Sequence, residues 1–186
     1  SVGPALGKDS VEQGIRAMGT TGMTLKDLAF SGQTSSHAID ILDSSNVTVK
    51  DSSFALPTVF LGPEAIRLES VSGVTVKRVD VDGGFVGVNF ACGICDGSEA
   101  PTNGVVKEST FLNTFTGILI ANSTNATVKR NKISEGDSLL CGFCGPAVIP
   151  ARGVHFSFRP NSGAKISDNE IFDNDGIGIR AAPGFG

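Results

Sequence analysis

The sequence contains no tryptophan and no tyrosine, and only 18% of its 186 residues are charged. The missing rings exclude the flat tryptophan or tyrosine platforms on which sugar-binding sites usually rely. A membrane-spanning helix needs an apolar run of about 18 residues, and the sequence contains no run of that length. With 15 Lys and Arg residues and a net charge of -4, the chain is not a general nucleic-acid binder. Its hydrophobic content of 40% also excludes a disordered chain.

Glycine and short β-branched runs are what the chain has in abundance, with 24 glycines in all. Strands favour β-branched and aromatic residues, and glycine marks the turns between them, so the composition predicts an all-β protein. A length of 186 residues fits one domain with a sizeable core. We therefore expect a single all-β domain over residues 1–186.

A fourteen-residue pattern repeats along the chain. Four copies align without a gap, at Gly14–Asp27, Ala38–Asp51, Ala65–Arg78 and Gly117–Arg130. Two further copies carry insertions and begin at Gly87 and Gly153, and a seventh begins at Gly176. A short unit of this kind cannot bury its apolar side chains alone, so the copies are expected to stack on one another.

Each copy contains two short runs of alternating apolar residues, and a third apolar position follows five residues later. Glycine or asparagine stands between the two runs and predicts a sharp turn with a left-handed backbone. Three short strands per copy describe one coil of a right-handed parallel β-helix of about six to seven coils. The expected inward columns are Ile15, Ile39, Ile66, Val88, Ile118, Val154 and Ile177; Leu25, Val49, Val76, Val106, Val128 and Ile166; and Phe30, Phe54, Val81, Phe111, Ile133 and Ile171. Asn131 and Asn169 are expected to stack at the turn between the second and third strands.

Other folds explain the repeat less well. A leucine-rich repeat needs an L-x-x-L-x-L consensus with a helical segment in each unit, and a β-sandwich would not keep one motif in register for seven copies. At the start of the chain, Asp9 and Ser10 could instead cap a helix. The ungapped match of Gly14–Asp27 to the other copies favours a strand there.

The copies resemble the repeats of the right-handed parallel β-helix family of pectate-lyase-like proteins, whose form is G-I-x-I-x-x-s-x-n-V-T-I-x-x-N. The resemblance covers the chain from about Gly14 to Arg180. It implies a secreted or cell-surface protein that cleaves, epimerises or binds polysaccharides, with an acidic polysaccharide or cell-surface glycan as partner and no cofactor. Many such proteins are non-catalytic structural or adhesion modules, and that alternative stays open because a fold does not determine a function.

In enzymes that the chain resembles, the cleft lies over the first strands of the coils. The outward positions there are Arg16, Asp40, Arg67, Asn89, Leu119, His155 and Gly178, followed two residues on by Glu69, Ser157 and Arg180. A uronate lyase or epimerase needs a cation beside the carboxylate, a base and an acid. Arg67 or Arg152 would supply the cation, and His155 would supply the base or the acid.

Asp40, Asn89 and Glu69 are the expected substrate contacts on the same face. Asp40 and Glu69 also form the carboxylate pair that a glycoside hydrolase would need, although Arg67 between them can pair with both. A mechanism with a tyrosine acid is excluded because the chain has no tyrosine. The alternative for the whole group is a set of surface ion pairs without a catalytic role.

The last outward position of the second strand is lysine in five successive copies: Lys26, Lys50, Lys77, Lys107 and Lys129. A line of ammonium groups about 5 Å apart matches an acidic polysaccharide. The alternative is that Asp27, Asp51 and Glu108 neutralise the lysines, which then only keep an exposed sheet soluble.

Four cysteines form two C-x-x-C pairs, Cys92 with Cys95 and Cys141 with Cys144. We expect disulfides, either within each pair or across the two loops, and these would place the chain outside the cytosol. A zinc site at the four thiolates is the alternative. Because the two pairs begin on opposite sides of the first-strand face, no metal site is assigned.

The ends of the helix need protection, because an open coil exposes unpaired backbone and apolar side chains. The sequence stops within its seventh copy and shows no capping pattern over residues 181–186. We therefore expect a piece of a longer β-helix, or end-to-end self-association.

Overall fold

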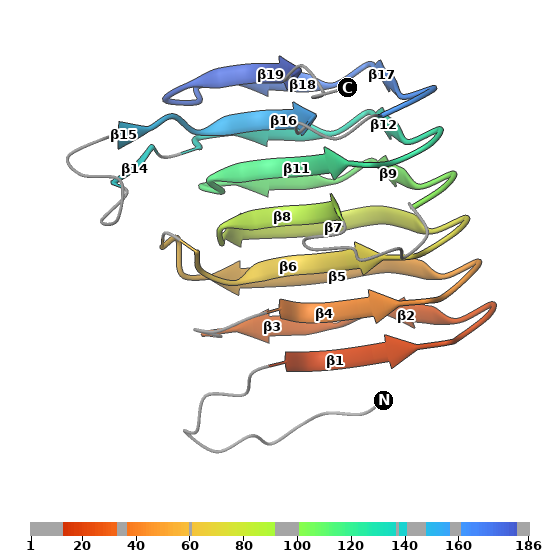
Figure 1. The fold of residues 1–186 in the computed structure, drawn as a ribbon. Helices are drawn as coiled ribbons and strands as arrows, with labels where there is room; N and C mark the ends of the chain where they lie inside the picture. Colours follow the sequence, from red (N-terminus) through yellow and green to blue (C-terminus); the bar gives the residue numbers. More distant parts are fainter. Residues whose placement is uncertain are drawn as a thin grey trace.

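The computed structural model describes residues 13–32, 37–59, 61–91, 101–136, 138–140, 148–156 and 161–181. Every regular element within these ranges is a β-strand. The strands stack one above another from the first copy of the repeat to the last (Figure 1). The start of the chain follows the strand prediction, because Gln13–Met18 forms strand β1 and not a helix.

The first sheet collects the first strand of every copy, and its neighbours pair in parallel. Its strands, in spatial order, are β1 (Gln13–Met18), β4 (His37–Leu42), β6 (Glu64–Glu69), β8 (Val86–Ala91), β11 (Thr116–Ala121), β16 (Arg152–Phe156) and β19 (Ile177–Ala181). Figure 1 shows the chain leaving a strand of this sheet, passing behind the sheet and returning one level higher in a right-handed sense, as from β6 through the second sheet to β8. The predicted parallel β-helix is confirmed.

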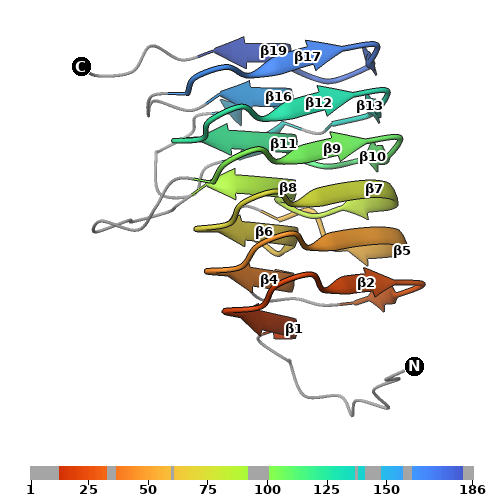
Figure 2. The same ribbon diagram turned by 90° about the vertical axis from the view of Figure 1, so that its right-hand side faces the viewer.

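The second sheet holds the second and third strands of each copy (Figure 2). Its second strands are β2 (Thr24–Lys26), the first parts of β5 (Thr48–Leu56) and β7 (Thr75–Gly83), β9 (Val105–Lys107), β12 (Thr127–Lys129) and β17 (Lys165–Ser167). Its third strands are β3 (Ala29–Ser31), the last parts of β5 and β7, β10 (Thr110–Leu112), β13 (Lys132–Ser134) and β18 (Glu170–Phe172). A short antiparallel pair, β14 (Leu139–Leu140) and β15 (Val148–Ile149), lies outside this pattern.

The corners of the coils take the left-handed backbone that the repeat predicts. After the first strand, positive φ angles occur at Gly22 (71°), Asn46 (53°), Gly73 (63°), Asn103 (53°), Asn125 (57°) and Gly163 (63°). These are residues that adopt this conformation at low cost. The bend between the second and third strands uses the same conformation at Asp51 and Arg78, so the chain turns inside β5 and β7 without ending the strand.

The apolar columns fill the interior. Ile39, Ile66 and Val88 are fully buried in the first column, and Phe54 and Phe111 are buried in the third. At the bend between the second and third strands, the predicted asparagine stack is confirmed. The Asn131 backbone N–H and its side-chain amide both donate to Asn169 Oδ1 at 2.9 Å.

The last strand departs from the predicted register by two residues. Val154 pairs with Ile179, and not with Ile177 as the repeat suggested. The sequence Gly-Ile-Gly-Ile repeats itself every two residues, so strand alternation cannot distinguish the two registers. Close backbone packing does distinguish them, because a Cβ on Gly153 would lie 2.5 Å from the carbonyl oxygen of Gly178. The same glycine-on-carbonyl contact joins Gly87 to Gly117 two levels below.

Gly87→Ala is expected to destabilise the coil by about 1–3 kcal/mol, since an inserted carbon must displace its neighbours. A Cβ at Gly87 would lie 2.5 Å from both the Gly117 carbonyl oxygen and Phe111 Cδ1. Gly178→Ala is the matched control, because the nearest atom to its Cβ is Ile171 Cγ2 at 3.5 Å. Urea unfolding followed by circular dichroism measures both, and equal midpoints would show that the close approach has no cost.

Candidate functional site

The outward residues of the first sheet form register columns that run across the strands. One column is Arg16, Asp40, Arg67, Asn89, Leu119, His155 and Arg180. A second column, three residues earlier, is His37, Glu64, Val86, Thr116 and Arg152. Polar residues therefore gather in two groups. The Asp40 group consists of Arg16, His37, Asp40, Glu64, Arg67, Glu69 and Asn89. The His155 group consists of Arg152, His155 and Arg180. Leu119 of β11 lies between them.

The Asp40 group is built around a fully buried carboxylate. Arg67 donates two hydrogen bonds to Asp40, at 2.8 and 3.0 Å, and Arg16 lies 3.6 Å from it. Arg67 also lies 3.7 Å from Glu69. Burial opposes the charged form of Arg67, but the hydrogen bond and charge of Asp40 raise its pKa. Arg67 is thus held by carboxylates of its own chain and is not free to neutralise a substrate.

Asn89, Glu64 and His37 form the rest of the Asp40 group. The Asn89 amide donates to Glu64 Oε1 at 2.9 Å, and His37 Nε2 lies 3.4 Å from Glu64 Oε2. The Asn89 side chain is almost fully buried, and its Oδ1 accepts no hydrogen bond from the described residues. Asn89 Oδ1 is therefore a buried acceptor without a partner among the described residues, one strand away from Leu119.

The His155 group is basic. Arg152 Nη1 lies 3.3 Å from His155 Nδ1, and the Arg152 guanidinium lies over the Phe115 ring at 5.7 Å. Arg180 of β19 is paired in register with His155. Burial and the Arg180 charge lower the pKa of Arg152. Within the described ranges, no carboxylate lies within 4 Å of Arg152 or Arg180.

The contact with Arg152 decides which nitrogen of His155 carries the proton. An arginine can only donate, so Nδ1 must accept and the proton of the neutral ring sits on Nε2. His155 Nε2 and Arg152 Nε are both buried and have no hydrogen-bond partner in the described part of the chain. The His155 group thus holds two buried N–H donors that lack an acceptor, which is costly unless an acceptor is supplied.

The structure brings some of the predicted catalytic residues together and separates others. Arg152 and His155 are in contact, whereas Arg67 lies three strands away from His155, at about 14 Å by strand spacing. Arg180 joins His155 in place of Gly178, because of the register of the last strand. Sequence reasoning put Arg180 two residues further on, and the self-similar Gly-Ile-Gly-Ile motif gave no signal to correct this.

The stability of the chain is expected to fall as the pH drops from about 6.5 toward about 4. Burial, with the charges of Arg152 and Arg180, lowers the pKa of His155 to about 4 in the folded chain. An unfolded histidine has a pKa of about 6.5, so between these values the unfolded state binds more protons and gains stability relative to the fold. Urea midpoints at pH 7.5, 5.5 and 4.5 measure the effect. If His155→Gln kept the same pH dependence as the parent between these values, the depressed pKa would be wrong.

The lysines of the second strands occupy one register column, as expected: Lys26, Lys50, Lys77, Lys107 and Lys129. We call this column the lysine ladder. It lies on the second sheet, on a different face from the His155 group (Figure 2). The expected neutralisation by acids is observed at Lys26, whose Nζ lies 3.4 Å from Asp27.

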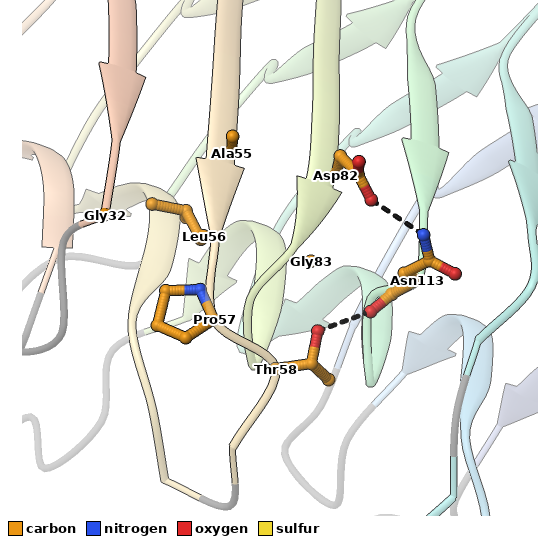
Figure 3. A pocket seen from close by; sticks show the side chains of 8 residues that line it. All are labelled: Gly32, Ala55, Leu56, Pro57, Thr58, Asp82, Gly83 and Asn113. Carbon is orange, nitrogen blue, oxygen red and sulfur yellow. Dashed lines mark hydrogen bonds between the residues drawn. The ribbon is translucent and has the colours of Figure 1, made fainter.

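A hollow of about 360 Å³ opens beside the third strands (Figure 3). Leu56, Pro57 and Gly83 form part of its wall. Thr58 Oγ1 donates to the Asn113 carbonyl oxygen at 2.8 Å, and the Asn113 amide donates to Asp82 Oδ1 at 2.7 Å. Because these polar groups are used within the chain, the hollow is not the candidate site.

The four cysteines Cys92, Cys95, Cys141 and Cys144 lie outside the described residues, so the disulfide and zinc interpretations stay predictions. Among the residues that are described, no three His, Cys, Asp or Glu side chains are grouped to hold a metal ion. The same part of the chain contains no helix long and apolar enough to cross a membrane.

The family model "Right handed beta helix region" matches residues 64–184, nearly two thirds of the chain. The chain belongs to the right-handed β-helix family. No curated protein matches it. The right-handed β-helix match includes β6 to β19 and therefore all of the His155 group. Membership supports the fold, while the function depends on the side chains that this chain displays.

Proposed function

We propose that this right-handed β-helix binds acidic polysaccharides outside the cell, with a uronate carboxylate held by Arg152, His155 and Arg180. The observation that carries the proposal is the pair of buried N–H donors, His155 Nε2 and Arg152 Nε, that have no acceptor among the described residues. A carboxylate is the acceptor that suits two cations and a neutral imidazole, because charged hydrogen bonds are the strong ones. It would also relieve the repulsion between Arg152 and Arg180.

The neighbouring strands fit the rest of a disaccharide. Leu119 of β11 is next to His155 in the register column and offers an apolar surface to a sugar ring. Asn89 of β8 is the next residue in that column and has an unused Oδ1, which can accept from a hydroxyl group. The distance from His155 to Asn89 is two strand spacings, about 10 Å. Hydroxyl donors and a carboxylate acceptor on one ligand would thus meet complementary groups along one line.

The geometry favours recognition over lyase or epimerase chemistry. A base must have a free lone pair, but His155 Nδ1 faces a guanidinium N–H of Arg152. With a pKa of about 4, the imidazole is also a weak base at neutral pH, where the best general bases have a pKa near the working pH. Arg67, the other residue expected to neutralise the substrate carboxylate, is held by Asp40. We therefore assign the site to binding.

Calorimetric titration with a galacturonate dimer tests the proposal, with the neutral galactose dimer as the matched ligand. Arg180→Gln and His155→Ala are each expected to weaken uronate binding by about 10-fold or more, since a hydrogen bond to a charged group contributes about 1.5–3 kcal/mol. Arg16→Gln removes the same charge from the far end of the same column and is expected to change binding less than 2-fold.

Two results would overturn the proposal. Equal affinity for the neutral dimer would show that the site does not recognise the carboxylate. New absorbance at 235 nm on incubation with polygalacturonate, lost in His155→Ala, would replace recognition by a lyase reaction.

A further inference from the structure

The lysine ladder is the second strongly charged feature of the molecule, and the proposed uronate site does not use it. Its five lysines are in register on β2, β5, β7, β9 and β12, so neighbouring side chains start about 4.8 Å apart. Figure 2 shows these strands stacked along the helix axis, so a column in register across them runs along that axis. Threonines at Thr24, Thr48, Thr75 and Thr127 form a second, parallel column two residues earlier.

The carboxylates that could have neutralised the lysine ladder form ion pairs with arginines instead. Arg78 donates two hydrogen bonds to Asp51, at 2.6 and 3.1 Å. Arg130 lies 2.7 Å from Glu108, and Arg78 lies 3.9 Å from the same carboxylate. Four ladder lysines consequently have no carboxylate within 4 Å in the ranges that the structure describes: Lys50, Lys77, Lys107 and Lys129.

Charge is divided unevenly between this face and the rest of the chain. The ladder, Lys165 beside it and the adjoining corner column together carry eight basic residues, namely Lys26, Lys50, Lys77, Lys107, Lys129, Lys165, Arg78 and Arg130, and four acidic ones, Asp27, Asp51, Glu108 and Asp168. This face therefore has a net charge of +4, whereas the whole chain has -4, which leaves -8 elsewhere. A local field of this kind attracts polyanions to one face of an acidic protein.

We infer that the outward face of β2, β5, β7, β9 and β12 docks a linear acidic polysaccharide, laid along the helix axis with its carboxylates facing the lysine ladder. The ladder repeats once per strand, about every 4.8 Å, so those carboxylates of an extended polyuronate that face the sheet meet a continuous line of ammonium groups. The threonine hydroxyls lie alongside to exchange hydrogen bonds with sugar hydroxyls. This surface is independent of the uronate site on the first sheet, because no residue is shared.

A nucleic acid fits the face less well. Single-stranded nucleic acids are held by aromatic side chains on which bases stack, in addition to a basic groove. The outward residues of these second strands are threonine, lysine and valine, and none is aromatic. A polyuronate carries a carboxylate on every sugar unit, so charges and hydroxyl groups such as those of this face can hold it without an aromatic platform.

Binding to long polygalacturonate tests the inference, with fully methyl-esterified polygalacturonate as the uncharged ligand and single-stranded DNA as the competing polyanion. Lys77→Gln/Lys107→Gln removes the centre of the ladder and is expected to weaken polygalacturonate binding about 10-fold or more. It should also flatten the dependence of the binding constant on salt, because fewer counterions are released. The control Arg16→Gln/Lys132→Gln removes two charges elsewhere on the surface and is expected to have less than a 3-fold effect.

The two proposals fail separately. Measured in a His155→Ala background, the ladder variant should still lose polymer binding, and in the parent background it should leave binding of the galacturonate dimer unchanged. Equal loss in the control variant, equal affinity for the esterified polymer, or tighter binding of DNA than of polygalacturonate would each overturn the ladder as a polysaccharide surface.

Discussion

Asp40→Ala is expected to lower the free energy of unfolding by about 3–5 kcal/mol, because it leaves a partly buried arginine without the carboxylate that accepts its two hydrogen bonds. The Asp40 side chain is fully buried, and Arg67 binds it through two hydrogen bonds from the next strand. Arg16 contacts the same carboxylate from the other side, so three coils are joined by one group. Its removal should therefore reduce the urea midpoint strongly.

Asp51→Asn is the matched control for this prediction, because asparagine removes the charge and still tolerates the left-handed backbone at this bend. Asp51 also accepts two hydrogen bonds from an arginine one coil away, Arg78, but their side chains are 33% and 47% exposed. The hydrogen bond from Arg78 lowers the pKa of Asp51, yet solvent screens the pair, and its loss should change the midpoint little. Equal effects of the two substitutions would contradict the role assigned to burial.

Phe54→Ala is expected to cost about 3–5 kcal/mol of stability, the usual range for a buried phenylalanine. The Phe54 side chain is 1% exposed in the third inward column. Its ring stacks on Phe30 at 5.1 Å between centroids, nearly parallel. Alanine would leave a cavity between coils and remove this stacking.

Phe172→Ala serves as its control, since Phe172 is 40% exposed on the outward side of β18. Its contact with Lys132 is a surface cation–π interaction at 5.3 Å. We expect a change below about 1 kcal/mol. If urea unfolding gave similar midpoints for both variants, burial in the third inward column would not stabilise the fold.

The columns could be predicted from the sequence because each depends on one repeated property. Alternating apolar residues identified the strands, and glycine or asparagine identified the corners. Five lysines at one position predicted the ladder directly. Where the local sequence repeated every two residues, as at Gly176 to Ile179, the same rule failed and Arg180 was misplaced.

The chemistry of the site could not be predicted in the same way, because it depends on which neighbouring side chain each arginine contacts. Arg67 and Arg78 each turn toward an aspartate of the preceding coil, while Arg152 turns toward a histidine of its own strand. A repeat pattern gives the register but not the rotamer. For this reason, the unpaired donors of the His155 group and the unpaired lysines are visible only in the folded chain.

The most direct test of the proposed site is a long-range ¹H–¹⁵N correlation spectrum of His155 at pH 6, with and without the galacturonate dimer. We expect a neutral ring protonated at Nε2 in the free protein, and a downfield shift of that proton when the carboxylate accepts it. The galactose dimer should leave the resonance unchanged. A ring that is already half protonated at pH 6, or an Nε2 proton that does not respond to the uronate, would contradict the account.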